Sequence, residues 1–323
     1  FFLLPSSFFL LPSSFPLLPS SFFLLPSSFF LLPYSTSSFF SFLLLTSSFF
    51  LLPFFLLPSY FFLSYFFCCT CAVQLALVHN QGLQVEIGFM LRRHPNLMWI
   101  EQALGSGAIG EVYTARSTVG QYLPDWRPDR DYRETYSAIK EWGGGVILDL
   151  THELDYLVWW FGRVSDVAAN AGRLSKLELD VEDVAQMLLK FETGVLAQVH
   201  LDYLRKRFHR SVEVVGSEGT LRWEYDAGSV HLLTQEAEML VHQVPANFDR
   251  NDMFLDHMRS FLGRISGTGR DEGVSNLEDG VHVMEIVLAA HRSHELRSFI
   301  SPVQISELVE GPERHMGRKP SLP

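Results

Sequence analysis

The sequence predicts an α+β domain in which helices cover one face of an open, mainly antiparallel β-sheet. The first observation is a block of strand-like segments between about residues 163 and 244, with the turn signals ETG, GSEG and DAG between several of them. Consecutive strands joined by short turns pair antiparallel. The second observation is that the predicted helices lie before and after this block, which is the order of an α+β fold.

Each element follows from its pattern of apolar residues. Pro95 opens a helix with Leu97, Ile100 and Leu104 on one face, and residues 146–161 form a second helix with an aliphatic stripe. Two more helices are expected at about 252–265 and 277–297. Strands are expected at about 81–88, 111–123, 163–173, 182–191, 194–204, 210–216, 219–225, 228–234 and 238–244.

The first part of the chain differs in composition from the rest. All 61 charged residues (25 basic, 36 acidic) lie at or after Glu86, whereas 20 of the 28 phenylalanines fall in the first 67 positions. The unit FFLLPSS repeats from Phe1 with a proline every seven residues, which excludes a coiled coil. We interpret residues 1–71 as a low-complexity repeat that is disordered or an artefact of the gene model.

An apolar stretch at residues 60–78 is long enough to cross a bilayer. Its only strongly polar residue is Gln74, but no Lys or Arg flanks the stretch to set an orientation. A membrane-tethered form through residues 60–78 is therefore kept as the less favoured alternative.

The remainder of the chain has the composition of an ordinary globular protein. About a quarter of the residues from Glu86 onward are charged. The formal net charge of −11 argues against a nucleic-acid partner. All three cysteines, Cys68, Cys69 and Cys71, precede the predicted fold. The folded part therefore offers no disulfide and no cysteine metal site. We expect no bound metal, and we expect a cytoplasmic location.

A glycine motif at residues 104–112, LGSGAIGEV, has the spacing of a dinucleotide-binding loop in Gly105, Gly107 and Gly110. Such a loop follows a strand and opens a helix, so that a pyrophosphate meets the helix N-terminal amides. Here the motif follows a predicted helix and precedes a predicted strand. We therefore expect Gly105 to be the C′ cap of the helix and the other glycines to form a turn.

The segment GGGVILDLTHELDY at 143–156 carries residues suited to proton transfer. Helical spacings of three place Asp149, His152 and Asp155 on one face, away from the aliphatic stripe. An imidazole beside a carboxylate forms a proton-transfer pair. The same spacing fits a solvated helix face, and on spacing alone that interpretation is slightly favoured.

Six segments, in this order, resemble the Gfo/Idh/MocA family of nicotinamide-dependent oxidoreductases. They are EIGFMLRRHP at 86–95, SGAIGEV at 106–112, YLPDWRPDRDYRETYSA at 122–138, GGGVILDLTHELDYLVWWFG at 143–162, VVGSEGTL at 214–221 and EDGVHVMEIVLAAHRS at 278–293. The resemblance implies that His152 is the acid/base residue, Asp149 its partner, and Arg92 a residue near the nicotinamide end of the cofactor. It also implies NAD or NADP as cofactor and a homo-oligomer that pairs through the free face of the sheet.

The loop at 122–138 is the expected substrate-binding segment. Aromatic faces stack on sugar rings, and Arg and Asp bind hydroxyls or carboxylates. Without the resemblance, the better interpretation is a polar loop anchored by a few aromatic residues. With the resemblance, the better interpretation is a loop that binds a sugar, a cyclitol or a sugar acid. The substrate-binding residues expected are Tyr122, Trp126, Arg127, Tyr132, Arg133, Tyr136 and Asp155.

The resemblance breaks down at the front of the chain. Family members begin with a complete Rossmann domain that carries a glycine fingerprint and an E-K-P motif, and neither is present here. The expected organisation is thus residues 1–71 as the repeat, 72–95 as the remnant of a Rossmann domain, 96–302 as the substrate and dimerisation domain, and 303–323 as a tail. We expect a truncated sugar oxidoreductase that is inactive as this chain; whether it binds a cofactor stays open. The alternative is a non-catalytic sugar-binding or dimerisation domain.

Overall fold

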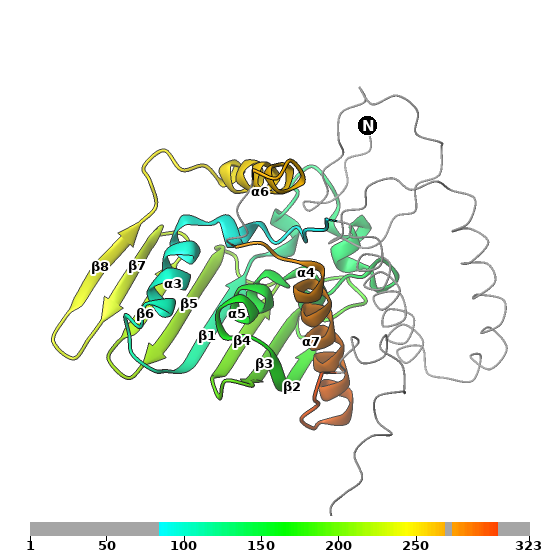
Figure 1. The fold of residues 1–323 in the computed structure, drawn as a ribbon. Helices are drawn as coiled ribbons and strands as arrows, with labels where there is room; N and C mark the ends of the chain where they lie inside the picture. The colour runs from blue at the N-terminus through cyan, green and yellow to red at the C-terminus, as the bar shows by residue number, and fades with distance from the viewer. Residues whose placement is uncertain (1–83, 269–272, 303–323) are drawn as a thin grey trace, which may run out of the picture. The chain divides into compact units, whose positions relative to one another are not determined.

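The structure, a computed structural model, describes residues 84–268 and 273–302. Its centre is an eight-stranded sheet with the order β2-β3-β4-β1-β5-β6-β7-β8 (Figure 1). The strands are β1 (Val112–Gly120), β2 (Val164–Gly172), β3 (Val184–Phe191), β4 (Leu196–Asp202), β5 (His209–Gly216), β6 (Thr220–Glu224), β7 (Ser229–Leu233) and β8 (Glu238–Gln243). The expected strands between residues 163 and 244 are confirmed, with ends that shift by one or two residues.

Strand pairing confirms a mainly antiparallel sheet with one exception. β1 precedes the block of strands in sequence, yet it lies between β4 and β5. It pairs antiparallel with β5 and parallel with β4, where Ala115 lies opposite Ala197. A parallel neighbour requires a long crossover, and residues 121–195, which carry two α-helices and two other strands, supply it.

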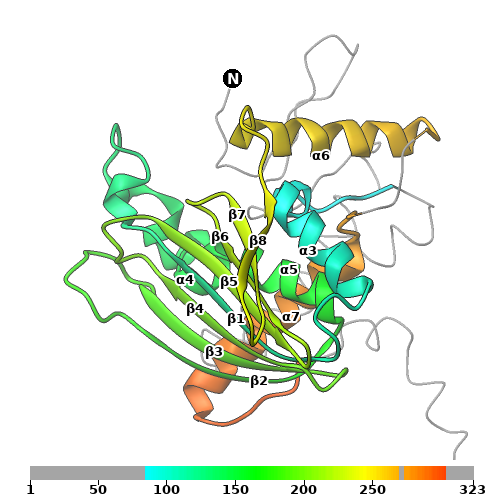
Figure 2. The same cartoon turned by 90° about the vertical axis from the view of Figure 1, so that its left-hand side faces the viewer.

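Helices cover one face of this sheet, as the sequence predicts (Figure 2). In β3 the side chains of Ala185, Met187 and Leu189 are at most 1% exposed, while those between them are exposed. α7 packs along β2, where the Ala169 amide donates to Ser293 Oγ at 2.9 Å. The helices are η2 (Met90–Arg93), α3 (Pro95–Gly105), η3 (Leu123–Asp125), η4 (Tyr132–Glu134), η5 (Tyr136–Ala138), η6 (Lys140–Trp142), α4 (Val146–Asp149), α5 (His152–Phe161), α6 (Arg250–Ile265) and α7 (Leu277–Leu296).

The glycine motif ends α3 and precedes β1, so it does not open a helix. The prediction that Gly105 is the C′ cap is wrong by two residues, because Gly105 is still helical and Gly107 adopts the left-handed conformation with φ +77°. The Gly107 amide donates to the Leu104 carbonyl at 3.0 Å, and the Ala108 amide donates to the Ala103 carbonyl at 2.9 Å. These two bonds form a Schellman motif, which satisfies the last carbonyls of the helix.

Two alanine substitutions in this motif are expected to have opposite effects. Gly107→Ala should lower the free energy of unfolding by about 1–2 kcal/mol, since a Cβ atom is strained at positive φ. Gly105→Ala should be neutral or stabilising by up to about 1 kcal/mol, since Gly105 is helical and a Cβ there meets nothing within 4 Å. Urea denaturation of both variants measures the difference, and equal losses would contradict the cap assignment.

The single helix expected at 146–161 is wrong, because the structure contains two helices with a break between them. Leu150 leaves the helical region with φ −108° and ψ 41°, and α5 restarts at His152. Asp149 and His152 therefore lie on different helices, and the argument from a spacing of three on one helix does not apply to them.

The strand expected at 81–88 is also wrong for its described part, since residues 84–89 form no strand. No described strand lies beside this segment, so it has no ladder to join. Instead, the Ile87 amide donates to the Ser275 carbonyl at 2.8 Å, and the Ile87 side chain is 1% exposed. The expectations for residues 1–71, 60–78, 72–83 and 303–323 lie outside the described residues.

Candidate functional site

Asp149, the last residue of α4, is held by three hydroxyl groups. Its carboxylate accepts hydrogen bonds from Tyr136 Oη at 2.8 Å, Ser137 Oγ at 2.6 Å and Tyr203 Oη at 2.9 Å. Burial raises the pKa of Asp149, and the three hydrogen bonds oppose that shift. Sequence analysis missed Ser137 and Tyr203, and no local pattern singles them out. The three donors come from η5 and from the end of β4, so only the fold brings them to Asp149.

His152, the first residue of α5, has contacts different from those of Asp149. Its ring meets the edge of Phe89 at 5.7 Å, and its buried Nδ1 has no hydrogen-bond partner among the described residues. Burial lowers the pKa of His152 to about 3, and the charge of Arg210 adds to this effect. The imidazole is therefore neutral at pH 7, with one nitrogen able to accept a proton. No hydrogen bond between described residues joins it to Asp149.

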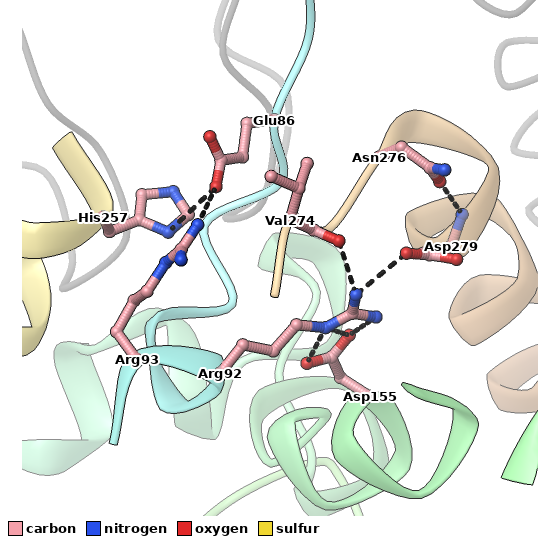
Figure 3. A network of polar contacts seen from close by, with 8 residues as sticks. All are labelled: Glu86, Arg92, Arg93, Asp155, His257, Val274, Asn276 and Asp279. Atoms are coloured by element: carbon pink, nitrogen blue, oxygen red, sulfur yellow. Dashed lines mark hydrogen bonds and ion pairs between the residues drawn. The ribbon is translucent and has the colours of Figure 1, made fainter. Parts of the chain in front are cut away.

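Arg92 and Asp155 form a buried ion pair (Figure 3). Arg92 is 2% exposed and Asp155 is fully buried. Arg92 Nη2 donates to Asp155 Oδ1 at 2.7 Å, and Nε lies 3.1 Å from both carboxylate oxygens. Arg92 Nη1 donates to the Val274 carbonyl at 2.7 Å and to Asp279 Oδ2 at 2.9 Å. Burial raises the pKa of Asp155 to about 6, against the opposing charge of Arg92.

In this structure Arg92 and Asp155 bind each other, and the donors of Arg92 contact protein acceptors. The cofactor role of Arg92 and the substrate role of Asp155 stay predictions. Arg92 and Asp155 connect η2, α5 and the start of α7. In this arrangement they hold the helix that carries His152.

Glu86 forms a second buried cluster beside the first (Figure 3). Its carboxylate is 1% exposed and lies 3.0 Å from Arg264 Nη2, 3.4 Å from Arg93 Nη2 and 3.6 Å from His257 Nδ1. Burial lowers the pKa of His257 to about 4, helped by the two arginine charges. The contact between Glu86 and His257 is thus with a neutral imidazole at pH 7. The cluster fastens residues 86–93 to α6.

Acid is expected to weaken the fold through His94 and His257. These side chains are 2% and 4% exposed, and burial lowers their pKa values to about 3 and about 4. Below pH 6.5 the unfolded chain binds protons that the folded chain does not, so stability falls as the pH drops. Each histidine should cost about 1.4 kcal/mol at pH 5.5. The raised pKa of Asp155 opposes part of this loss below pH 6.

Urea denaturation at pH 7.5, 6.5 and 5.5 measures the effect. The variant His257→Gln removes one of these groups and should flatten the profile by about 1.4 kcal/mol between pH 7.5 and 5.5. Profiles of the wild type and the variant that run parallel would contradict the assignment.

The loop predicted to bind substrate divides into free and engaged side chains. Arg133 is engaged, because it pairs with Asp131 at 2.6 Å and Glu178 at 2.9 Å. The Tyr132 hydroxyl accepts from the Glu178 amide at 3.0 Å, and Lys206 covers the Tyr122 ring. A shallow hollow with essentially no enclosed volume remains, and its lining residues are Leu123, Trp126, Arg127, Tyr132 and Thr135.

The hollow adjoins the group of hydroxyls around Asp149. Trp126 meets the Tyr203 ring edge-on at 5.3 Å, and Arg127 lies 5.2 Å from the centre of the Tyr136 ring. The structure thus brings Trp126, Arg127, Tyr132 and Tyr136 together near Asp149. It does not include Tyr122, Arg133 or Asp155 in this lining.

Within residues 84–268 and 273–302, no three His, Cys, Asp or Glu side chains are grouped to hold a metal ion. No helix in these same ranges is both long and apolar enough to span a membrane.

The structure has an open sheet with helices on one face and a polar site beside α4 and α5. This is the architecture that the six family-like segments of the sequence predict. Residues 98–222 match the GFO/IDH/MocA C-terminal domain. The match covers less than half of the chain.

The curated relatives that it resembles include sugar-converting enzymes. The chain is 31% identical over 201 residues to a 1,5-anhydro-D-fructose reductase from Ensifer adhaerens, covering 58% of this chain and 56% of the relative. It is 31% identical over 158 residues to a D-apiose dehydrogenase from Paraburkholderia graminis, covering 47% of this chain and 40% of the relative. The chain thus spans about half the length of the curated relatives it matches.

Solved structures share the fold. An oxidoreductase from Agrobacterium radiobacter in complex with NAD+, L-tartaric acid and magnesium superposes with a TM-score of 0.61 at 19% identity, over 75% of this chain and 70% of that one. A levoglucosan dehydrogenase in complex with NADH gives a TM-score of 0.58 at 19% identity, over 67% and 65%. At this identity the likeness establishes the fold alone.

Proposed function

We propose that the described domain is the substrate-binding part of an oxidoreductase that acts on a sugar, cyclitol or sugar acid. The observation that carries this proposal is the Asp149 carboxylate, fixed by three hydroxyls directly beside a hollow lined by Trp126, Arg127 and Tyr132. Aromatic rings and a guanidinium suit the faces and polar groups of a sugar ring. The sugar-converting relatives support the same class of substrate.

We propose, from the resemblance, that His152 accepts the proton of the substrate hydroxyl. His152 does not line the hollow, so the substrate must extend from the hollow to the His152 ring. The imidazole is neutral at pH 7, and substrate binding must raise its pKa from about 3 towards neutrality for it to act as a base. The fixed carboxylate of Asp149 orients the hydroxyls of Tyr136, Ser137 and Tyr203. Asp149 therefore acts on the site through these hydroxyls and makes no hydrogen bond of its own to His152.

The described residues do not fit a dinucleotide. The one glycine motif with the right spacing caps the C-terminus of α3, where the helix presents carbonyls and not amides. NAD or NADP supplies the hydride chemistry of such reactions when it is bound. We propose that the described domain recognises the sugar without holding the dinucleotide.

Titration of the full chain with sugars tests the proposal. Tryptophan fluorescence is a suitable signal because Trp126 lines the hollow. We expect a saturable change with at least one of levoglucosan, 1,5-anhydro-D-fructose, D-apiose and D-glucuronate. The lack of a saturable change with all four, in a protein that stays folded by circular dichroism, would overturn the proposal.

A non-catalytic sugar-binding or dimerisation domain is the second candidate, favoured by the lack of a dinucleotide site among residues 84–268 and 273–302. On the face of the sheet opposite the helices, Leu188 and Leu196 are 51% and 54% exposed. We propose that a second copy of the chain covers this face, as the resemblance implies. The cytoplasmic location of the protein stays a prediction. Light scattering measures the molar mass of the wild type and of a Leu188→Lys variant. We expect a dimer for the wild type and a monomer for the variant.

A further inference from the structure

The loop at 122–138 contains three arginines, and they differ in what they contact. Arg133 is saturated by Asp131 and Glu178, and Arg130 is exposed to solvent. Arg127 is half-buried and forms no ion pair with any described residue. Of the three arginines, Arg127 alone both lines the hollow and retains a guanidinium without a carboxylate partner.

The surroundings of Arg127 do not neutralise it by direct contact. Its guanidinium lies beside the Tyr136 ring, at 5.2 Å from the ring centre. Asp149 is the carboxylate that interacts with it through space, but Asp149 lies beyond ion-pair distance and already accepts three hydroxyl hydrogen bonds. A half-buried cation without a close counter-charge is a site that an anion stabilises.

The lining of the hollow has an excess of donors. The Trp126 indole Nε1 is buried and has no hydrogen-bond acceptor among the described residues. The Thr135 hydroxyl donates to the Tyr132 carbonyl at 2.6 Å, and no lining residue carries a carboxylate. Arg127 forms a side-chain hydrogen bond with Tyr136, which leaves other N–H groups of its planar fork without a carboxylate partner. These groups and the unmatched Trp126 indole are donors of the kind that a carboxylate accepts.

We propose that Arg127 is a specificity-determining residue that pairs with the carboxylate of a sugar acid, so that the site prefers a sugar acid to a neutral sugar. This inference rests on the proposed function, because it names the substrate class of the same site. Arg133 and Arg130 take no part in this recognition, since one is engaged and the other does not line the hollow.

Equilibrium binding to the full chain tests the inference. The probes are D-glucuronate, D-glucose and D-glucose 6-phosphate, and the variants are Arg127→Gln and the matched control Arg133→Gln. We expect D-glucuronate to bind at least 10-fold more tightly than D-glucose to the wild type. Arg127→Gln should weaken D-glucuronate binding by about 10- to 100-fold and leave D-glucose binding unchanged, as for a lost charged hydrogen bond. Arg133→Gln should stay within about twofold of the wild type.

The outcomes separate this inference from the proposed function. Equal binding of D-glucose and D-glucuronate, unaffected by Arg127→Gln, overturns the inference and leaves the proposed function in place. Tighter binding of D-glucose 6-phosphate than of D-glucuronate overturns the carboxylate assignment in favour of a phosphate. Failure of every sugar, including the neutral ones, to bind removes the proposed function itself.

Discussion

Replacing Arg92 with methionine is expected to lower the free energy of unfolding by about 3–5 kcal/mol. The substitution removes the partner of Asp155, a carboxylate that is fully buried, and leaves its charge unpaired in the interior. The Val274 carbonyl and Asp279 also lose a donor. Urea denaturation followed by circular dichroism at pH 7.5 measures the loss.

Two controls show whether the loss comes from the unpaired charge. Arg133→Gln removes an exposed arginine with two carboxylate partners and should change the stability far less than Arg92→Met, because exposed ion pairs contribute little. The double variant Arg92→Met with Asp155→Leu should recover part of the stability, because an apolar pair needs no counter-charge. A loss below about 1 kcal/mol for Arg92→Met would contradict the structural role assigned to the pair.

Asp149→Ala is expected to cost about 2–4 kcal/mol of unfolding free energy. The three hydroxyls of Tyr136, Ser137 and Tyr203 would lose their common acceptor, and an unsatisfied buried donor costs about 1–3 kcal/mol. The expected sum is smaller than three separate losses, because hydroxyl groups rotate to new partners. The same denaturation experiment measures this variant.

The matched variant Asp149→Asn keeps one oxygen acceptor and nearly the same volume. It should therefore lose less stability than Asp149→Ala, while the position of the hydroxyls beside the hollow is largely kept. Indistinguishable losses for the two variants would show that the acceptor oxygens do not hold the cluster together.

The strands were predictable because their signal is local. In β3, alternation of apolar and polar residues follows directly from one buried and one exposed face, and the turns at 192–194 and 217–219 mark where strands end. The parallel pairing of β1 with β4 was not predictable in this way. It depends on which of several compatible strands β1 meets in space, and the sequence of β1 itself carries no such information.

Helix boundaries failed where tertiary contacts override periodicity. The apolar stripe from Ile147 to Phe161 is continuous in sequence, yet the helix is interrupted at Leu150. The break allows Asp149 to reach the three hydroxyls while α5 keeps its buried face. The end of α3 was also misplaced. The motif contains Gly105, Gly107 and Gly110, and the sequence does not show which of them adopts the left-handed conformation; in the structure Gly107 is the one that caps the helix.

The candidate site was predicted in part. His152, Asp149 and the loop residues Trp126, Arg127, Tyr132 and Tyr136 were singled out by residue type, and the structure places the loop residues near Asp149. Arg92 and Asp155 were given ligand roles because charge in a motif suggests function. Their 63-residue separation hides the fact that they satisfy each other.

We propose that the domain formed by residues 84–268 and 273–302 recognises a sugar but does not itself hold the dinucleotide. Isothermal titration of the full chain, with the sugar identified by fluorescence and separately with NADH, tests it most directly. We predict saturable binding of the sugar that does not depend on NADH, and no saturable binding of NADH. Micromolar binding of NADH, or a requirement for NADH before any sugar binds, would contradict the claim.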